Sequence, residues 1–237
     1  MPAVEYYEGM LEEYLAGLVV NFDNGSTWIV DDIISEHEVQ SYGLPGATAV
    51  ASCTKLTNPN EGMQGILKVR LGLPWYSEKP ECETGAPEEI NYLGLNEYAA
   101  LTYLTRAGCT STPRLYKTLH SPQPEGFPLP GGSLLSLLME KLPRVCLNDV
   151  FWFKYNLEQR DRVREGFKKA FSEMRTCGYT NHDFGLHNLL WDDDTGKCYI
   201  IDMEECRTYK EDGFPVWQDT WYRIWGLEKR CGAPPFR

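Results

Sequence analysis

Three oxygen-bearing side chains flank a short predicted hairpin in the last third of the chain. Asp183 and Asn188 come just before the apolar residues 189–191, and Asp202 follows a second apolar run at 198–201. The segment between the runs reads Asp-Asp-Asp-Thr-Gly, which is typical of a turn. Because a hairpin brings its two ends together, we expect two carboxylates and one amide at one end of a small sheet. Such hard oxygen ligands suit Mg²⁺, which usually shares its coordination shell with substrate phosphates.

A lysine and a glutamate in the first half of the chain stand in unusual positions. Lys68 lies within a predicted strand at 65–71. Glu97 lies in a predicted helix at 88–106, on an apolar stripe that consists of Leu93, Ala100, Leu101 and Leu104. Burying a carboxylate is costly unless a cation meets it. Taken alone, the pattern favours a glutamate at the edge of the stripe that reaches solvent.

The order Asp183, four residues, Asn188, a hairpin and then Ile-Ile-Asp202-Met-Glu resembles the protein-kinase-like superfamily. The ending is more similar to the aminoglycoside/choline phosphotransferase-like branch, and to a fungal-type kinase-like protein, than to eukaryotic protein kinases. Upstream, Gly-Ile-Leu-Lys68-Val-Arg-Leu resembles the third strand of the N-lobe, and Leu-Asn-Glu97-Tyr-Ala-Ala-Leu resembles the helix whose glutamate fixes that lysine. The resemblance covers about residues 28–225.

The resemblance implies a role for each of these residues. Lys68 would hold nucleotide phosphates and Glu97 would hold Lys68, so the acid on the buried stripe gains its cation. Asn188 and Asp202 would ligate Mg²⁺, and Asp183 would be the catalytic residue that accepts or orients the acceptor's proton. The resemblance also implies a hinge that contacts adenine, formed by Met139, Glu140, Lys141 and Leu142. A turn at 41–46 would cover the phosphates with Gly43 and Gly46.

The implied fold is α+β and two-lobed, with an antiparallel-sheet N-lobe that carries one helix and a small helical C-lobe that carries the catalytic hairpin. The expected order is an acidic N-terminal extension at 1–27, the N-lobe at 28–138, the hinge at 139–143 and a reduced C-lobe at 144–237. The implied activity is ATP- and Mg²⁺-dependent transfer of the γ-phosphate to a hydroxyl of a small molecule or other acceptor. The small C-lobe leaves either an open site for a large acceptor, or a site completed by the N-terminal segment, a partner chain or an oligomer.

Departures from the family pattern keep other functions open. The histidine expected two residues before the catalytic aspartate is displaced to His182, with Asn181 in its place. Gly185 stands where protein kinases have a lysine, which argues against a Ser/Thr protein kinase, and the sequence contains no G-x-G-x-x-G loop. His187 either approaches the phosphates or shapes the loop. The alternatives are a catalytically inactive nucleotide-binding pseudokinase or scaffold, or an enzyme that uses ATP for nucleotidyl transfer or carboxylate activation.

Composition and charge narrow the expected partners. The 237 residues include 34 acidic and 23 basic ones, and nine of the acids lie in residues 1–54, which contain no lysine or arginine. An acidic surface repels nucleic acids and anionic membranes, so we expect neither as a partner. We expect the acidic segment to face away from the nucleotide, toward a cationic acceptor or partner. The eight cysteines have no metal-binding spacing and no leader or spanning segment stands out, so we expect a cytoplasmic protein with reduced thiols.

Apolar spacing predicts the remaining elements. We expect a helix over 6–20, strands over 27–34 and 47–56, and a helix over 157–176 whose buried face is Val163, Phe167, Ala170, Phe171 and Met174. Trp217, Trp221 and Trp225 are four residues apart and predict the core face of a terminal helix. Asp219 stands where the resembled family often has an aspartate that braces the catalytic loop.

Overall fold

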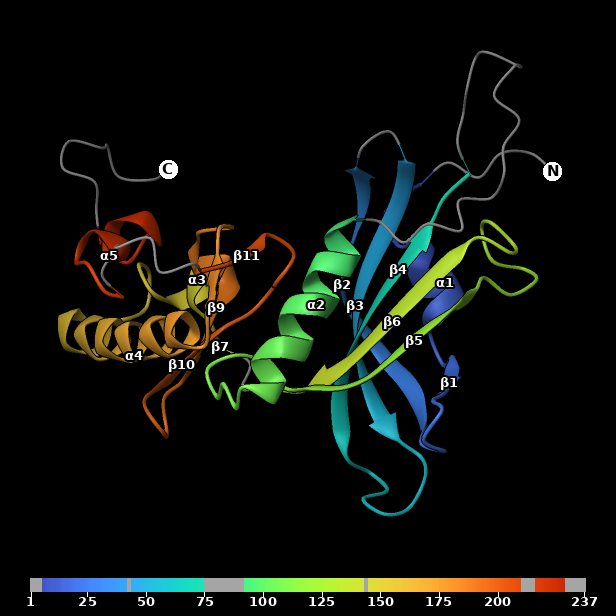
Figure 1. Cartoon of the computed structure of the whole chain (residues 1–237), viewed down its shortest axis with the longest axis horizontal. Helices are drawn as coiled ribbons and strands as arrows, with labels where there is room; N and C mark the ends of the chain where they lie inside the picture. The colour runs from blue at the N-terminus through green and yellow to red at the C-terminus, as the bar shows by residue number, and fades with distance from the viewer. Residues whose placement is uncertain (1–5, 42–43, 75–91, 143–144, 210–215, 229–237) are drawn as a thin grey trace, which may run out of the picture. The chain divides into compact units, whose positions relative to one another are not determined.

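The computed structural model describes residues 6–41, 44–74, 92–142, 145–209 and 216–228 (Figure 1). In these ranges the protein is of the mixed α+β class, with a six-stranded antiparallel sheet and five α-helices. The chain forms two compact units. The first lies within Met1–Tyr98 and Leu115–Lys141, and the second lies within Ala99–Arg114 and Leu142–Arg237. The predicted α+β class is confirmed, and the kinase-like architecture stays a prediction.

The first unit is built on the six-stranded sheet, in the order β1-β2-β3-β4-β6-β5 (Figure 1). Its strands are β1 Val19–Asn21, β2 Thr27–Ser41, β3 Leu44–Lys55, β4 Gln64–Gly72, β5 Leu115–Pro122 and β6 Ser133–Glu140. The three predicted strands are confirmed as β2, β3 and β4, and β2 runs seven residues beyond its expected end. Strand β4 pairs with both β3 and β6, and this central place accounts for its nearly continuous burial.

The two faces of β4 carry different chemistry. Leu67, Val69 and Leu71 belong to one apolar core together with residues of the N-terminal helix. Successive side chains of a strand point to opposite faces, so Lys68 and Arg70 lie on the other face of the sheet. Both cations are nevertheless buried, with 5% and 4% of their surface exposed. Side chains packed on that second face therefore have to supply negative charge.

The N-terminal helix is shorter than predicted. Helix α1 spans only Met10–Leu15, and the predicted helix over 6–20 is wrong beyond it, because Val19–Asn21 pairs with β2 as a strand. Gly17, with a φ of +71°, turns the chain between the two elements. The Glu36 carboxylate on β2 accepts a hydrogen bond from the Leu11 N–H at 3.0 Å, so a side chain of the sheet fixes the start of the helix.

The second unit combines one long helix with two small sheets. Helix α2 (Tyr92–Arg106) begins in the first unit and ends in the second, and residues 88–91 of its predicted range lie outside the described residues. The other elements are β7 Val145–Cys146, α3 Leu147–Val150, α4 Leu157–Thr176, β8 Tyr179–Asn181, the 3₁₀ turn η1 Leu186–Asn188, β9 Leu189–Asp192, β10 Lys197–Ile200, β11 Cys206–Thr208 and α5 Thr220–Ile224. The sheets have the orders β10-β9-β7 and β11-β8.

Helix α4 and the β9–β10 hairpin agree with the sequence. The helix has the predicted bounds, and all five residues of its predicted face are buried. A capping box between Asn156 and Gln159 satisfies backbone N–H groups at its start. The hairpin turn at 192–196 is held by the Asp192 carboxylate, which accepts from the backbone N–H of Asp194, as expected for turn chemistry. Local sequence signals were sufficient for both elements.

The buried face of α4 packs against the tryptophans near the C-terminus. The Phe171 ring centroid lies 4.8 Å from that of Trp221 and 6.0 Å from that of Trp217, and Phe167 lies 5.3 Å from Trp225. Helix α5 spans only five residues, so the prediction of one terminal helix through all three tryptophans is wrong in extent. Trp225 is buried, whereas Trp217 and Trp221 are half-buried.

Acidic side chains of the N-terminal part lie at the surface. Glu12 and Glu13 on α1 and Asp31 and Asp32 on β2 are exposed, and the Asp31 carboxylate accepts from a threonine hydroxyl of β3 at 2.7 Å. What these carboxylates face stays a prediction. No helix in the described part of the chain combines the length and the apolar character needed to cross a bilayer.

Gly166 of α4 is expected to be required for close packing on the hairpin. A Cβ added there would lie 2.5 Å from the buried Trp191 ring and 3.1 Å from the Gly196 carbonyl oxygen. Alanine favours helix by about 1 kcal/mol over glycine, but overpacking costs about 1–3 kcal/mol, and neither neighbour is a flexible side-chain end. We expect Gly166→Ala to lower the unfolding free energy by about 1 kcal/mol in urea titrations. Exposed Lys169→Ala on the same helix is the control, and a stabilised Gly166→Ala would contradict this packing.

Candidate functional site

Lys68 and Glu97 form a buried ion pair inside the first unit. Lys68 Nζ lies 3.0 Å from Glu97 Oε2 and donates to Oε1 at 3.1 Å. The two side chains are 6% and 2% exposed. The predicted pairing of the glutamate on the apolar stripe with this lysine is confirmed. Both charges have lost their water here, so the pair depends on the close geometry of its hydrogen bonds.

Arg70 is a second cation on the same carboxylate, and the sequence analysis did not identify it. Its Nη2 lies 2.9 Å from Glu97 Oε2, and its Nη1 donates to Thr48 Oγ1 at 3.2 Å. Residues two apart on a strand share a face, so Lys68 and Arg70 approach Glu97 side by side. That alternation in the predicted strand 65–71 was the signal that could have found Arg70.

In the second unit, the candidate catalytic carboxylate is held by the candidate metal ligand. Asn188 Nδ2 donates to Asp183 Oδ2 at 2.7 Å and to the Asp183 carbonyl oxygen at 3.1 Å. Asn188 is 3% exposed, whereas the Asp183 side chain is 44% exposed. Because Asn188 uses its amide nitrogen for these bonds, its Oδ1 is the atom left to act as an oxygen ligand. Asn188 could therefore bind a cation through Oδ1, beside the accessible carboxylate of Asp183.

Asn181 connects the two ends of the hairpin, and it is a second residue whose role the sequence analysis missed. Its Oδ1 accepts from the Asp183 N–H at 2.8 Å, and its Nδ2 donates to the carbonyl oxygens of Asp202 at 2.7 Å and Ile201 at 3.2 Å. Asn181 is completely buried. The displaced His182 lies at the surface instead. The pKa of His182 is lowered, mainly because part of the side chain is shielded from water and secondly because of the positive charge of Arg207. The side chain that ties the loop together is thus an amide.

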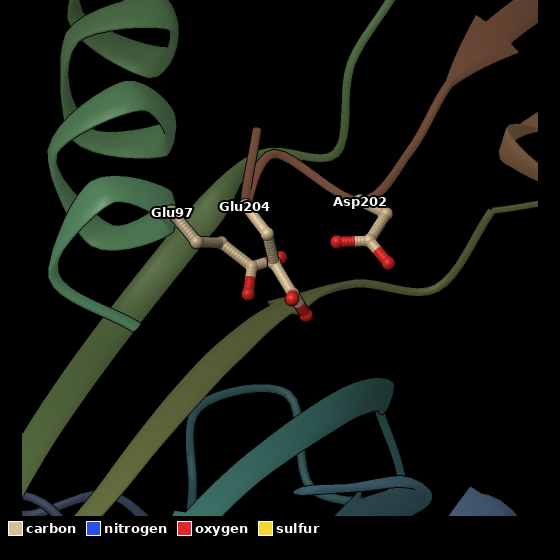
Figure 2. A group of neighbouring side chains, drawn as sticks. All are labelled: Glu97, Asp202 and Glu204. Carbon is tan, nitrogen blue, oxygen red and sulfur yellow. The ribbon is translucent and has the colours of Figure 1, made fainter. Parts of the chain in front are cut away.

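Asp202 has an uncommon backbone conformation. Its φ is +59°, a left-handed value that non-glycine residues seldom adopt outside special sites. Asp202 and Glu204 are half-buried, and each offers a carboxylate oxygen within 4.8 Å of the other's. Figure 2 shows both side chains on the segment after β10. Two carboxylate oxygens at this separation can share one divalent cation.

The backbone brings Asn188 and Asp202 to the same end of the hairpin. The Ile201 N–H donates to the Asn188 carbonyl oxygen at 2.9 Å, directly before Asp202. The hairpin register places Ile200 opposite Leu189, so the residues that flank this pair are neighbours. The expected grouping of Asp183, Asn188 and Asp202 at one end of a small sheet is confirmed. The side-chain ligand atoms that they offer are oxygens, which fits Mg²⁺ or another hard cation.

The predicted hinge residues lie where the chain passes from one unit to the other. Met139 and Glu140 are the last residues of β6, and the boundary between the two units lies between Lys141 and Leu142. Lys141 Nζ donates to Gln64 Oε1 on β4, and the side chains of Met139 and Leu142 are buried. Pro143 lies outside the described residues. Backbone contact with adenine stays a prediction.

The two glycines predicted to cover phosphates have different outcomes. Gly43 lies outside the described residues. Gly46 lies in β3, where a Cβ would meet the Leu71 carbonyl oxygen at 3.0 Å. This close approach of neighbouring strands is itself a reason for glycine at position 46. A phosphate contact by either residue stays a prediction.

His187 and Gly185 act together beside Asp183. His187 Nε2 lies 3.3 Å from Asp183 Oδ2, and the histidine side chain is about half exposed. A Cβ at Gly185 would lie 2.4 Å from the His187 ring, so the glycine leaves room for the imidazole. The ring therefore contacts the carboxylate of Asp183 in this structure, and an approach of His187 to phosphates stays a prediction.

Asp219 does not reach the catalytic loop in the hydrogen bonds of the described residues. Its Oδ1 accepts from the Trp217 indole N–H at 2.9 Å, and the residue is exposed just before α5. The sequence-based expectation that Asp219 braces the loop is therefore wrong here. Asn181, from the strand that enters the loop, makes the corresponding connection.

Comparison with protein-family models gives no match for this sequence, and comparison with curated proteins gives none either. Two structural features are therefore left to indicate a function. One is the Lys68–Glu97–Arg70 cluster of the first unit, and the other is the hydrogen-bonded loop of Asn181, Asp183 and Asn188 in the second.

Proposed function

We propose that this protein is a Mg²⁺- and ATP-dependent phosphotransferase that moves the γ-phosphate of ATP to a hydroxyl group of a small molecule or other acceptor. The observation that carries the proposal is the bonding of the loop that bears Asp183. Asn188 donates to the Asp183 carboxylate at 2.7 Å. Asn181 accepts from the Asp183 N–H and donates to the Asp202 carbonyl oxygen. Transfer of phosphate to a hydroxyl requires an accessible carboxylate close to oxygen ligands for the metal ion.

The residues of the second unit divide the work of this reaction. Asp183 accepts or orients the proton of the acceptor hydroxyl. Asn188 Oδ1 and the Asp202 carboxylate would hold Mg²⁺, which when bound neutralises the charge on the phosphates. The positive φ of Asp202 supports a functional placement, because strained backbone concentrates at sites where geometry matters.

The first unit supports nucleotide binding. Lys68 is a buried cation of the kind that holds phosphates, and its ion pair with Glu97 keeps the ammonium in place when no nucleotide is bound. Phosphoryl transfer depends mainly on positioning and on compensation of charge, so residues held by hydrogen bonds before substrate arrives favour it.

The proposal is tested by nucleotide binding and by product identity. We expect millimolar Mg-ATP to raise the unfolding temperature of the full chain, since a ligand that binds only the folded state stabilises it. Incubation with Mg-ATP, with water or the protein's own hydroxyls as acceptor, should release ADP. Adenosine without phosphates and ATP with EDTA are the controls. Absence of any stabilisation would favour a scaffold, and release of AMP would favour nucleotidyl transfer or carboxylate activation.

A further inference from the structure

Arg175, near the end of α4, is a buried cation without an acidic partner in the described part of the chain. Only 5% of its surface is exposed. Its guanidinium makes no hydrogen bond or ion pair with the described residues, and its Nε is fully buried without an acceptor. Burying a charge is costly unless the charge is paired and hydrogen-bonded. A bound anion would explain why the chain keeps a charge at this position.

Three aromatic rings surround the guanidinium. Its Cζ lies 4.0 Å from the ring centroid of Tyr209, 5.5 Å from that of Trp221 and 5.6 Å from that of Phe171. Ring faces attract a cation, but they do not accept the in-plane N–H groups at the edge of a guanidinium. Tyr209 and Trp221 are half-buried, so the cluster reaches the surface. The rings therefore compensate part of the charge and leave the N–H donors to a ligand.

Two indole groups of the same cluster also lack acceptors. Trp221 Nε1 and Trp225 Nε1 are buried without a hydrogen-bond partner. The Phe171 ring contacts both indoles, at 4.8 Å and 6.2 Å between ring centroids, as well as Arg175. All three groups are donors, and leaving a buried donor unsatisfied is unfavourable. The cluster therefore favours a ligand that brings acceptor oxygens.

The carboxylates on the neighbouring elements have other partners or face solvent. Glu173, on the same helix, accepts from the hydroxyls of Thr110 and Ser111. Asp219, just before α5, accepts from the indole N–H of Trp217. Glu205 is exposed in the turn before β11. None of these three carboxylates neutralises Arg175.

We propose that Arg175 is the centre of an anion-binding site in the second unit, and that its ligand is a small molecule that carries a carboxylate or phosphate group. A guanidinium binds both groups through two parallel N–H···O bonds. The site lies next to the candidate catalytic loop, since Phe184 directly follows Asp183 in that loop. The Phe184 ring packs against Trp221 and Trp225, at 6.0 Å and 5.7 Å between centroids. The inference is independent of the proposed function.

Titration of the full chain with inorganic phosphate, and separately with acetate, tests the site. The buffer contains chloride at constant ionic strength and neither Mg²⁺ nor nucleotide. We expect a saturable change in tryptophan fluorescence, because Trp221 contacts Arg175, and a higher unfolding temperature at saturation. Saturation by either anion supports the site, and the tighter of the two identifies the group that it binds. A wild-type protein that responds to neither anion would overturn the proposal.

Substitutions at Arg175 assign the response to this side chain. Arg175→Met removes the charge and should abolish it. Arg175→Lys keeps the charge and the apolar stem but loses the planar fork, so we expect the Kd of the anion to rise by about tenfold or more. Unchanged binding in both variants would overturn the proposal.

Arg160 on the same helix provides the matched control. Its Cζ also lies over an aromatic ring, 5.2 Å from the centroid of Trp152, but its Nε donates to the Asn156 carbonyl oxygen at 3.3 Å. Arg160→Met removes an equal charge from a guanidinium that already has an acceptor, and it should keep the wild-type Kd. Equal weakening in Arg160→Met and Arg175→Met would indicate a general effect of charge and would overturn the proposal.

Discussion

Glu97→Ala should destabilise the protein by about 3–5 kcal/mol, because it removes the carboxylate that both Lys68 and Arg70 contact while leaving two cations buried. The truncation also leaves a gap on the face of the sheet where α2 begins to pack. Urea denaturation followed by far-ultraviolet circular dichroism measures the loss. A change of less than about 1 kcal/mol would contradict the view that this carboxylate neutralises the cations of β4.

Two further variants separate charge from volume. Glu97→Gln keeps the shape of the side chain and one acceptor oxygen but turns a donor toward the cations, so we expect it to recover only part of the stability. Glu61, which is exposed in the turn between β3 and β4, serves as the matched control within the same unit. Glu61→Ala should leave the unfolding free energy within about 0.5 kcal/mol of the wild-type value.

The Lys68–Glu97 pair could be predicted because two local anomalies explained each other. A glutamate on an apolar helical stripe and a lysine inside a buried strand each violate the usual pattern, and pairing resolves both. Arg70 violates the same pattern two residues later, but the family resemblance named only Lys68. Its contact with Thr48 depends on the register of β3 against β4, which no local pattern sets.

Errors in the predicted fold arose where tertiary pairing overrode local spacing. Val19 and Val20 fall within the helix predicted over 6–20, yet Val19–Asn21 pairs with β2, and Gly17 with its positive φ lies between this strand and α1. Strand β5 was not predicted, because Leu115–Pro122 is an edge strand that is only partly buried along its length and has no strong apolar pattern. Helix α4 was predicted correctly because its apolar stripe is a local signal.

The hydrogen bonds that brace the candidate catalytic loop also could not be predicted from local sequence patterns. Asn181 bonds Asp183 two residues away but Asp202 across 21 residues, and Asp202 has a left-handed backbone conformation. The sequence placed a histidine beside the aspartate and suggested an altered loop, but it did not identify the amide as the connecting group. Such a role follows from the three-dimensional path of the loop rather than from spacing.

Asp183→Asn is the change expected to affect activity most. Asparagine has the same shape, and its Oδ1 can still accept the bond that Asn188 Nδ2 now donates at 2.7 Å, so the loop should keep its structure. The amide cannot accept a proton from an acceptor hydroxyl. We therefore expect the rate of ADP formation from Mg-ATP to fall about 10²–10⁴-fold, the range typical for loss of a general base. The Kd of Mg-ATP and the unfolding temperature should change little.

The control separates this role from a general effect of removing a negative charge. Asp194 is exposed at the tip of the hairpin and lies in the same unit, so Asp194→Asn removes an equal charge without touching the loop. It should keep the wild-type rate of ADP formation. A wild-type rate in Asp183→Asn would refute its assignment as the base, because Asn188 holds that carboxyl group, Asn181 holds the Asp183 backbone N–H, and the loop offers no other accessible carboxylate to replace it. Equal losses in both variants would instead point to long-range electrostatics of an acidic protein.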